Sequence, residues 1–178
     1  VILVGEMRDA ETAQIGLRAA ITGHMVLSTL HTLDALSAPT RLLDMEAPRF
    51  MVATSLQAVI AQRLVRLVCE GCAAPDTPTA QELRFIEALR PDAGAGLRRG
   101  RGCGHCNGSG FRGRSGAYEM LEMTPRLVEA LAKGDITGFR RGAEEEMAGE
   151  TFVRHAAVLA AAGRTTVSEV MRISHAED

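Results

Sequence analysis

Two apolar runs near the start of the chain each end in a cluster of polar residues. Residues 1–4 are apolar and mostly β-branched, and they lead through Gly5 to Glu6. Residues 24–30 form a second, largely apolar run, and His31 follows it. Such runs are typical of strands covered on both faces of a sheet. Because ligands in open α/β sheets bind at the carboxyl ends of the strands, both polar clusters are candidate site residues.

Helical periodicity and turn residues divide the rest of the chain. We expect helices over residues 9–20, 34–45, 50–58 and 81–89, and strands within residues 59–68 and 117–123. Residues 94–116 are rich in glycine and arginine, which predicts a loop. From Thr124-Pro125, a favourable helix start, the pattern predicts mostly helix, broken at Gly134, Gly149 and Gly163. The order of elements indicates an α/β fold in three regions, residues 1–68, 69–116 and 117–178.

Composition narrows the class of protein. Hydrophobic residues make up 46% of the 178, but aromatic residues only 3%, so the core must be built from aliphatic side chains and methionine. The formal charge of −2 gives no overall basic field, so we expect no nucleic-acid partner. Neither a signal peptide nor an apolar run long enough to span a membrane is present in the sequence, which predicts a soluble, intracellular protein. Since the chain begins with Val1 inside a predicted strand, we expect it to be part of something longer.

The four cysteines come as two pairs of identical spacing, Cys69/Cys72 and Cys103/Cys106, with 30 residues between the pairs. Two Cys-x2-Cys turns can supply four thiolates to one tetrahedral ion, which is the ligand set of a structural Zn²⁺ site. His105 lies inside the second pair, where we expect a solvent-facing residue and not a ligand. The alternative is four buried or redox-active cysteines.

Two further patterns lie in this region. Residues 108–113 match G-x-G-x-x-G, but they follow a cysteine pair and not a strand, so we do not interpret them as a dinucleotide site. Residues 103–110 match the C-x-x-C-x-G-x-G zinc repeat of Hsp40-type chaperones in a single copy. This match supports an alternative function as a zinc-dependent, non-catalytic binding or adaptor module.

The two strand motifs together resemble the secretion ATPase superfamily, the hexameric motors of type II secretion and type IV pilus assembly. The motifs are V-G-E-M-R-D-A-E-T-A at residues 4–13 and T-G-H-M-V-L-S-T-L-H-T-L-D-A at residues 22–35. Gly5-Glu6 is similar to the family's Walker B motif, and residues 22–32 are similar to its His box. Residues 61–65, the tetracysteine, and residues 110–119 and 163–170 match the family in the same order. The tetracysteine is similar to the assembly ATPases rather than the retraction ATPases.

This resemblance implies a fold and a set of site residues. The fold is the C-terminal half of a RecA-like P-loop NTPase domain (residues 1–68), with a zinc-binding insertion (69–116) and a further strand and helical C-terminal subdomain (117–178). Glu6 is expected to activate the attacking water, Arg8 to link Glu6 to neighbouring loops, and His24 and His31 to contact the γ-phosphate side. Seven extended residues span about 23 Å, so at most one histidine can touch the γ-phosphate directly. The alternative for Glu6 is a structural ion pair with Arg8.

One family motif is absent from the sequence. No G-x-x-x-x-G-K-[ST] occurs, because the single lysine, Lys133, lies in Leu-Ala-Lys-Gly. We therefore expect ATP and Mg²⁺ to be cofactors of a longer protein and this chain alone to be inactive. The resemblance further implies a hexameric homo-oligomer in the cytoplasm, associated peripherally with the inner membrane through a platform protein of the secretion or pilus machine.

Overall fold

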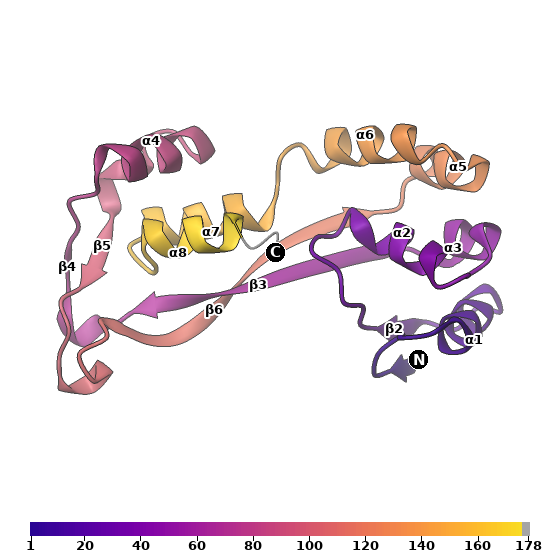
Figure 1. The fold of residues 1–178 in the computed structure, drawn as a ribbon, viewed down its shortest axis with the longest axis horizontal. Helices are drawn as coiled ribbons and strands as arrows, with labels where there is room; N and C mark the ends of the chain where they lie inside the picture. Colours follow the sequence, from indigo (N-terminus) through magenta and orange to yellow (C-terminus); the bar gives the residue numbers. More distant parts are fainter. Residues whose placement is uncertain (176–178) are drawn as a thin grey trace. The chain divides into compact units, whose positions relative to one another are not determined.

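The computed structural model describes residues 1–175 and divides them into two compact units. Unit 1 comprises Val1–Ala61 and Met120–Gly149, and unit 2 comprises Gln62–Glu119 and the residues from Glu150 onward. The elements follow one another along the chain as drawn in Figure 1. They are β1 (Ile2–Val4), α1 (Ala10–Ile21), β2 (Val26–Ser28), α2 (Ser37–Asp44), α3 (Arg49–Ser55), β3 (Ala58–Val68), η1 (Glu70–Cys72), β4 (Ala73–Pro75), α4 (Ala80–Leu89), η2 (Ala93–Gly96), β5 (Arg98–Gly100), η3 (Gly104–Cys106), β6 (Phe111–Glu122), α5 (Pro125–Lys133), α6 (Ile136–Met147), α7 (Phe152–Ala161) and α8 (Val167–Ser174).

In unit 1, β1 and β2 form a parallel pair joined by the crossover helix α1. The register sets Ile2 opposite Val26 and Val4 opposite Ser28. Asp9 caps α1, because its Oδ1 accepts a hydrogen bond of 2.8 Å from the backbone N–H of Thr12. The core of this unit consists mostly of aliphatic side chains from α1, α2, α3, α5, α6 and β6, together with Phe139 of α6. The aliphatic side chains include Leu17, Leu42, Val52, Leu121, Leu127 and Leu131.

Within residues 1–175, only one face of the strand pair in unit 1 is covered. Val4 and Val26 pack against the core, whereas Leu3 is 78% exposed and Leu27 is 52% exposed. Residues 1–175 do not supply the cover that the sequence predicts for the second face of these strands. Both strands are also shorter than predicted, because the ladder ends at Ser28.

Unit 2 contains the antiparallel pair β4–β5, the helices α4, α7 and α8, and most of β3 and β6. β3 and β6 pair with each other in a two-stranded sheet. The buried core of this unit is aliphatic and includes Val65, Ile86, Leu97, Ala156, Ala160 and Val170. The predicted tetracysteine region, residues 69–116, lies wholly inside this unit. The predicted C-terminal region contributes α5 and α6 to unit 1 and α7 and α8 to unit 2.

Most predicted elements are present, with two corrections. β6 begins at Phe111 and not at residue 117, and β5 also lies inside the predicted loop of residues 94–116. The helix expected over residues 50–58 ends at Ser55, and Ala58 already belongs to β3. In both places pairing with a strand distant in sequence decides the conformation, and the local composition does not contain that information. No helix among residues 1–175 is long and apolar enough to cross a membrane.

Candidate functional site

Glu6 lies just beyond the carboxyl end of β1 and has both carboxylate oxygens engaged. Oε1 is 2.8 Å from His31 Nε2, and Oε2 accepts from Arg8 Nε at 2.6 Å. Because a carboxylate oxygen accepts hydrogen bonds, the contact with His31 requires a proton on Nε2. The side chain of Glu6 is 17% exposed, whereas those of His31 and Arg8 are 85% and 76% exposed. The structure thus brings three of the four predicted site residues of unit 1 together at one edge of the strand pair.

His24 lies apart from this cluster, at the other end of β2. Its Nδ1 is 3.2 Å from Thr22 Oγ1 and 3.2 Å from the carbonyl oxygen of Ala19. These contacts hold the imidazole against the C-terminal turn of α1 and not against Glu6. The two histidines therefore occupy opposite ends of β2, as their spacing predicts.

The four cysteines converge in unit 2. Their sulfur atoms all lie within 4.8 Å of one another, and none is part of a disulfide. The distances are 3.9 Å for Cys69–Cys103 and 3.8 Å for both Cys72–Cys106 and Cys103–Cys106. These distances are far longer than a disulfide bond of about 2.05 Å. The set can hold one metal ion.

Backbone hydrogen bonds favour a thiolate at Cys106, whereas burial raises the pKa of the Cys72 thiol to about 11. The N–H groups of Cys103 and Gly110 donate to Cys106 Sγ at 3.2 and 3.3 Å, and these bonds, that of Cys103 first, lower the pKa of the Cys106 thiol to about 6. The backbones of Gly100 and Gly110 lie in close contact, since a Cβ on Gly100 would lie 2.0 Å from the carbonyl oxygen of Gly110. Glycine is thus required by close approach at these two positions.

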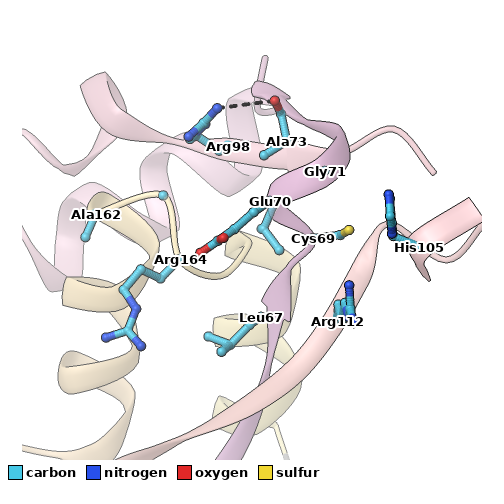
Figure 2. Close-up of a pocket in the computed structure, with 12 residues that line it drawn as sticks. Leu67, Cys69, Glu70, Gly71, Ala73, Arg98, His105, Arg112, Ala162 and Arg164 are labelled. Carbon is cyan, nitrogen blue, oxygen red and sulfur yellow. Dashed lines mark hydrogen bonds between the residues drawn. The ribbon is translucent and has the colours of Figure 1, made fainter. Parts of the chain in front are cut away.

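An open pocket of about 660 Å³ lies beside the cysteine cluster (Figure 2). Basic side chains line it, namely Arg98, Arg112, Arg164 and His105, together with the carboxylate of Glu70. Arg98 Nη2 donates to the carbonyl oxygen of Ala73 at 3.2 Å. Figure 2 shows the side chain of Arg164 directed away from Cys69, so the guanidinium groups do not converge on one point. The G-x-G-x-x-G match of residues 108–113 runs into β6 and opens no helix, as expected for a pattern without a dinucleotide role.

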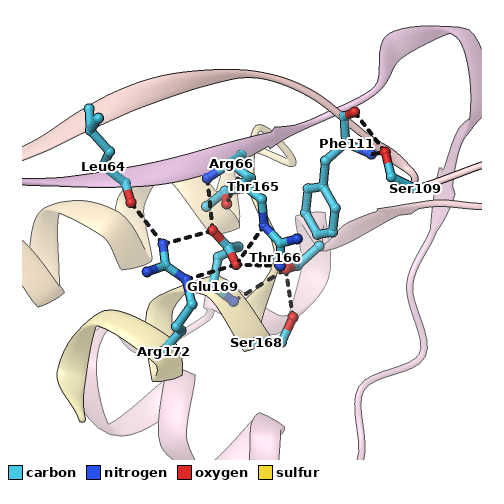
Figure 3. A network of polar contacts seen from close by, with 9 residues as sticks. All are labelled: Leu64, Arg66, Ser109, Phe111, Thr165, Thr166, Ser168, Glu169 and Arg172. Carbon is cyan, nitrogen blue, oxygen red and sulfur yellow. Dashed lines mark hydrogen bonds and ion pairs between the residues drawn. The ribbon is translucent and has the colours of Figure 1, made fainter. Parts of the chain in front are cut away.

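Glu169 is a buried carboxylate to which the sequence motifs assign no role. It lies on α8 with 1% of its side chain exposed, and it accepts from Arg66 of β3 and from Arg172 (Figure 3). The bonds from Arg66 are 2.8 Å from the backbone N–H and 3.0 and 2.8 Å from the guanidinium. Arg172 also donates to the carbonyl oxygen of Leu64 at 2.8 Å. The network therefore fastens the last described helix to β3.

The charge of Glu169 depends on these partners. Burial alone would raise the pKa of Glu169, but the hydrogen bonds from Arg172 and Arg66 outweigh it and lower the pKa to about 2. A signal was present in the sequence, because Thr166-x-x-Glu169 has the form of a capping box. The Thr166 hydroxyl does accept from the N–H of Glu169 at 3.3 Å, but the carboxylate turns to the arginines instead of back to Thr166.

Glu169→Gln is expected to destabilise unit 2 by about 2 kcal/mol at neutral pH. Removing one partner of a fully buried pair costs about 3–5 kcal/mol, and the half-exposed guanidiniums reduce that figure. The folded pKa of about 2 lies below the ordinary 4.5, so the stabilisation is present above pH 4.5 and is lost as the pH falls toward 2. Urea unfolding at neutral and acidic pH measures the free energy of unfolding of both proteins. The difference between variant and wild type should shrink as the pH is lowered. Glu129→Gln, in an exposed pair, is the control; equal effects of both variants would contradict the role of burial.

The chain is similar to known secretion proteins over nearly its whole length. The profile of the family described as "Type II/IV secretion system protein" matches residues 1–172. The "Type II secretion system protein E" of Pseudomonas aeruginosa is 38% identical over 188 residues, which cover 99% of this chain and 35% of the relative. The "Type IV pilus assembly ATPase PilB" of Thermus thermophilus is 38% identical over 172 residues, which cover 96% of this chain and 19% of the relative. The chain thus spans about a third or less of the length of these relatives.

A solved structure shares the fold. The pilus retraction motor PilT, solved with bound ADP, superposes with a TM-score of 0.63 at 24% identity, covering 99% of this chain and 40% of PilT. This likeness confirms the predicted RecA-like α/β fold class. Since the family profile covers almost the whole chain and a relative is 38% identical to it, the chain belongs to the Type II/IV secretion system protein family.

Proposed function

We propose that this chain is the C-terminal part of a longer ATPase (the full-length protein) that powers type II secretion or type IV pilus assembly. The observation that carries the proposal is the Glu6 carboxylate at the carboxyl end of β1, oriented by His31 and Arg8. A fixed carboxylate at this end of a strand is suited to take a proton from an attacking water. Family membership and the names of the relatives point to ATP as the substrate.

The predicted residues then have separate roles. Glu6 is the general base, His31 orients it from the side where we expect the γ-phosphate, and Arg8 holds its second oxygen. His24, which is bound to α1, acts from elsewhere, orienting a neighbour or reaching across a subunit boundary. Within residues 1–175 the cysteine cluster is the only group of three or more His, Cys, Asp or Glu side chains close enough to hold a metal. We expect Mg²⁺ to arrive with ATP and to be held mostly by other parts of the full-length protein.

We propose Zn²⁺ as the metal of the cysteine cluster. Four sulfurs at about 2.3 Å from a tetrahedral Zn²⁺ lie about 3.8 Å from one another. The three sulfur–sulfur distances of 3.8–3.9 Å given above match this value. All four positions are sulfur, which leaves no open position for a substrate, so the role is structural. The ion would fasten η1 and η3 together through Cys69, Cys72, Cys103 and Cys106.

The assembly belongs to the proposal as well. We expect a homohexamer, since the resemblance is to ring-shaped motors, and a location in the cytoplasm at the inner membrane, where a platform protein would receive the motion. No nucleic-acid partner is expected. The second candidate, a zinc-dependent adaptor without catalysis, is favoured by the cysteine cluster but leaves the Glu6, Arg8 and His31 cluster without a purpose.

The experiment that tests the proposed function compares ATP hydrolysis by the full-length protein and by residues 1–178 alone. We expect turnover from the former and negligible turnover from the latter, because phosphoryl transfer depends on a phosphate-binding loop and lysine that residues 1–178 lack. Phosphate release, with a zinc-loaded sample in both cases, measures this. A full-length protein that binds its partners but hydrolyses no ATP would support the adaptor instead.

A further inference from the structure

One residue holds the backbone on both sides of Glu6. The Thr29 hydroxyl donates to the carbonyl oxygen of Gly5 at 2.8 Å. The carbonyl oxygen of Thr29 accepts from the N–H of Met7 at 3.1 Å. Gly5 and Met7 are the neighbours of Glu6 in the chain, so both peptide groups that flank the carboxylate residue are tied to Thr29.

The paired strands end before this point. The register of β1 and β2 closes with Val4 opposite Ser28, and Gly5 lies outside β1. A Cβ added to Gly5 would meet no atom of residues 1–175 within 4 Å beyond its chain neighbours, so packing does not fix the conformation of Gly5. The Thr29 hydroxyl therefore joins the two chain segments one residue beyond the end of β1, at Gly5. The peptide plane of Gly5 sets the direction of the Glu6 side chain.

We infer that Thr29 is a positioning residue for the catalytic carboxylate, acting through its hydroxyl on the peptide between Gly5 and Glu6. The inference rests on the proposed function, since it assigns Thr29 a role in the reaction of Glu6. Arg8 and His31 contact the carboxylate itself, whereas Thr29 controls the backbone from which it projects. A misplacement of about 1 Å can cost a reaction about 10²-fold. Thr29 is exposed, so loss of one hydrogen bond there has little effect on global stability.

The variant that tests this is Thr29→Val, which has nearly the same shape but no hydroxyl. In the full-length protein we expect kcat for ATP hydrolysis to fall about 10- to 100-fold, with KM for ATP and the midpoint of urea unfolding unchanged. Thr29→Ser, which keeps the hydroxyl, is expected to restore kcat. Thr54→Val is the matched control, because the Thr54 hydroxyl donates to a carbonyl oxygen within α3, that of Phe50, at 2.8 Å.

Hydrogen exchange gives a readout that does not depend on turnover. Exchange of the Met7 amide should be faster in Thr29→Val than in the wild type and normal in Thr29→Ser. Either a normal kcat or normal Met7 exchange in Thr29→Val would overturn the inference, and so would a change in KM alone or a failure of serine to rescue. A wild-type protein without ATPase activity would refute the proposed function instead, and unchanged exchange of Met7 would still refute the hold of Thr29 on this segment.

Discussion

The Glu6→Gln variant of the full-length protein is expected to bind ATP and to hydrolyse it about 10²- to 10⁴-fold more slowly than the wild type. Glutamine has the shape of glutamate but cannot take a proton from water. Its amide can still meet Arg8 or His31 through the oxygen, so the end of β1 should stay in place. Single-turnover phosphate release measures the chemical step, and a fluorescent ATP analogue measures binding.

Controls separate catalysis from the ion pair that Glu6 forms with Arg8. Glu11→Gln, an exposed glutamate in the first turn of α1, should leave kcat unchanged. Arg8→Gln should lower kcat less than Glu6→Gln, because Glu6 keeps its bond to His31. If Glu6→Gln instead retained full turnover and lost stability, the contact with Arg8 would be a structural ion pair, which is the alternative that the sequence left open.

Local signals predicted much of the fold. The start of α1 near Asp9, the Thr124-Pro125 helix start and the helix end at Gly134 could all be predicted from the sequence, because each signal acts within one helical turn. The tetracysteine could be predicted for a similar reason, since two short spacings define its ligand set. The comparisons confirm the family that these motifs predicted.

Contacts between distant residues were not predicted. Arg66 and Glu169 are separated by 103 positions, and no local pattern connects a strand arginine with a carboxylate that resembles part of a capping box. The early start of β6 has the same origin, because its Gly/Arg-rich first half is a strand only through its pairing with β3. The meeting of His31 with Glu6 also depends on the parallel register of β1 and β2. The motifs predicted the candidate residues, and the pairing of strands decides which of them meet.

Loss of the metal is expected to unfold the cysteine region while unit 1 keeps its structure. The full-length protein should contain one Zn²⁺ per chain, and Cys69→Ser should remove it, because three thiolates bind a structural zinc far more weakly than four. Cys69 is buried beside the end of β3, so the substitution also places a serine hydroxyl at a buried position. We expect amide exchange to rise about tenfold or more over β4, β5 and η3. The helices α5 and α6 of unit 1 should exchange as before.

His105→Gln is the matched control for that experiment. His105 lies between Cys103 and Cys106, but it is exposed and outside the sulfur set, so the variant should keep its zinc and its exchange pattern. Elemental analysis and hydrogen exchange are measured on the same samples, and a chelator added to the wild type should reproduce the effect of Cys69→Ser. Zinc-free wild-type protein with paired, oxidised cysteines would contradict the metal site and favour a redox role. Loss of zinc in His105→Gln would contradict a site made of the four sulfurs alone.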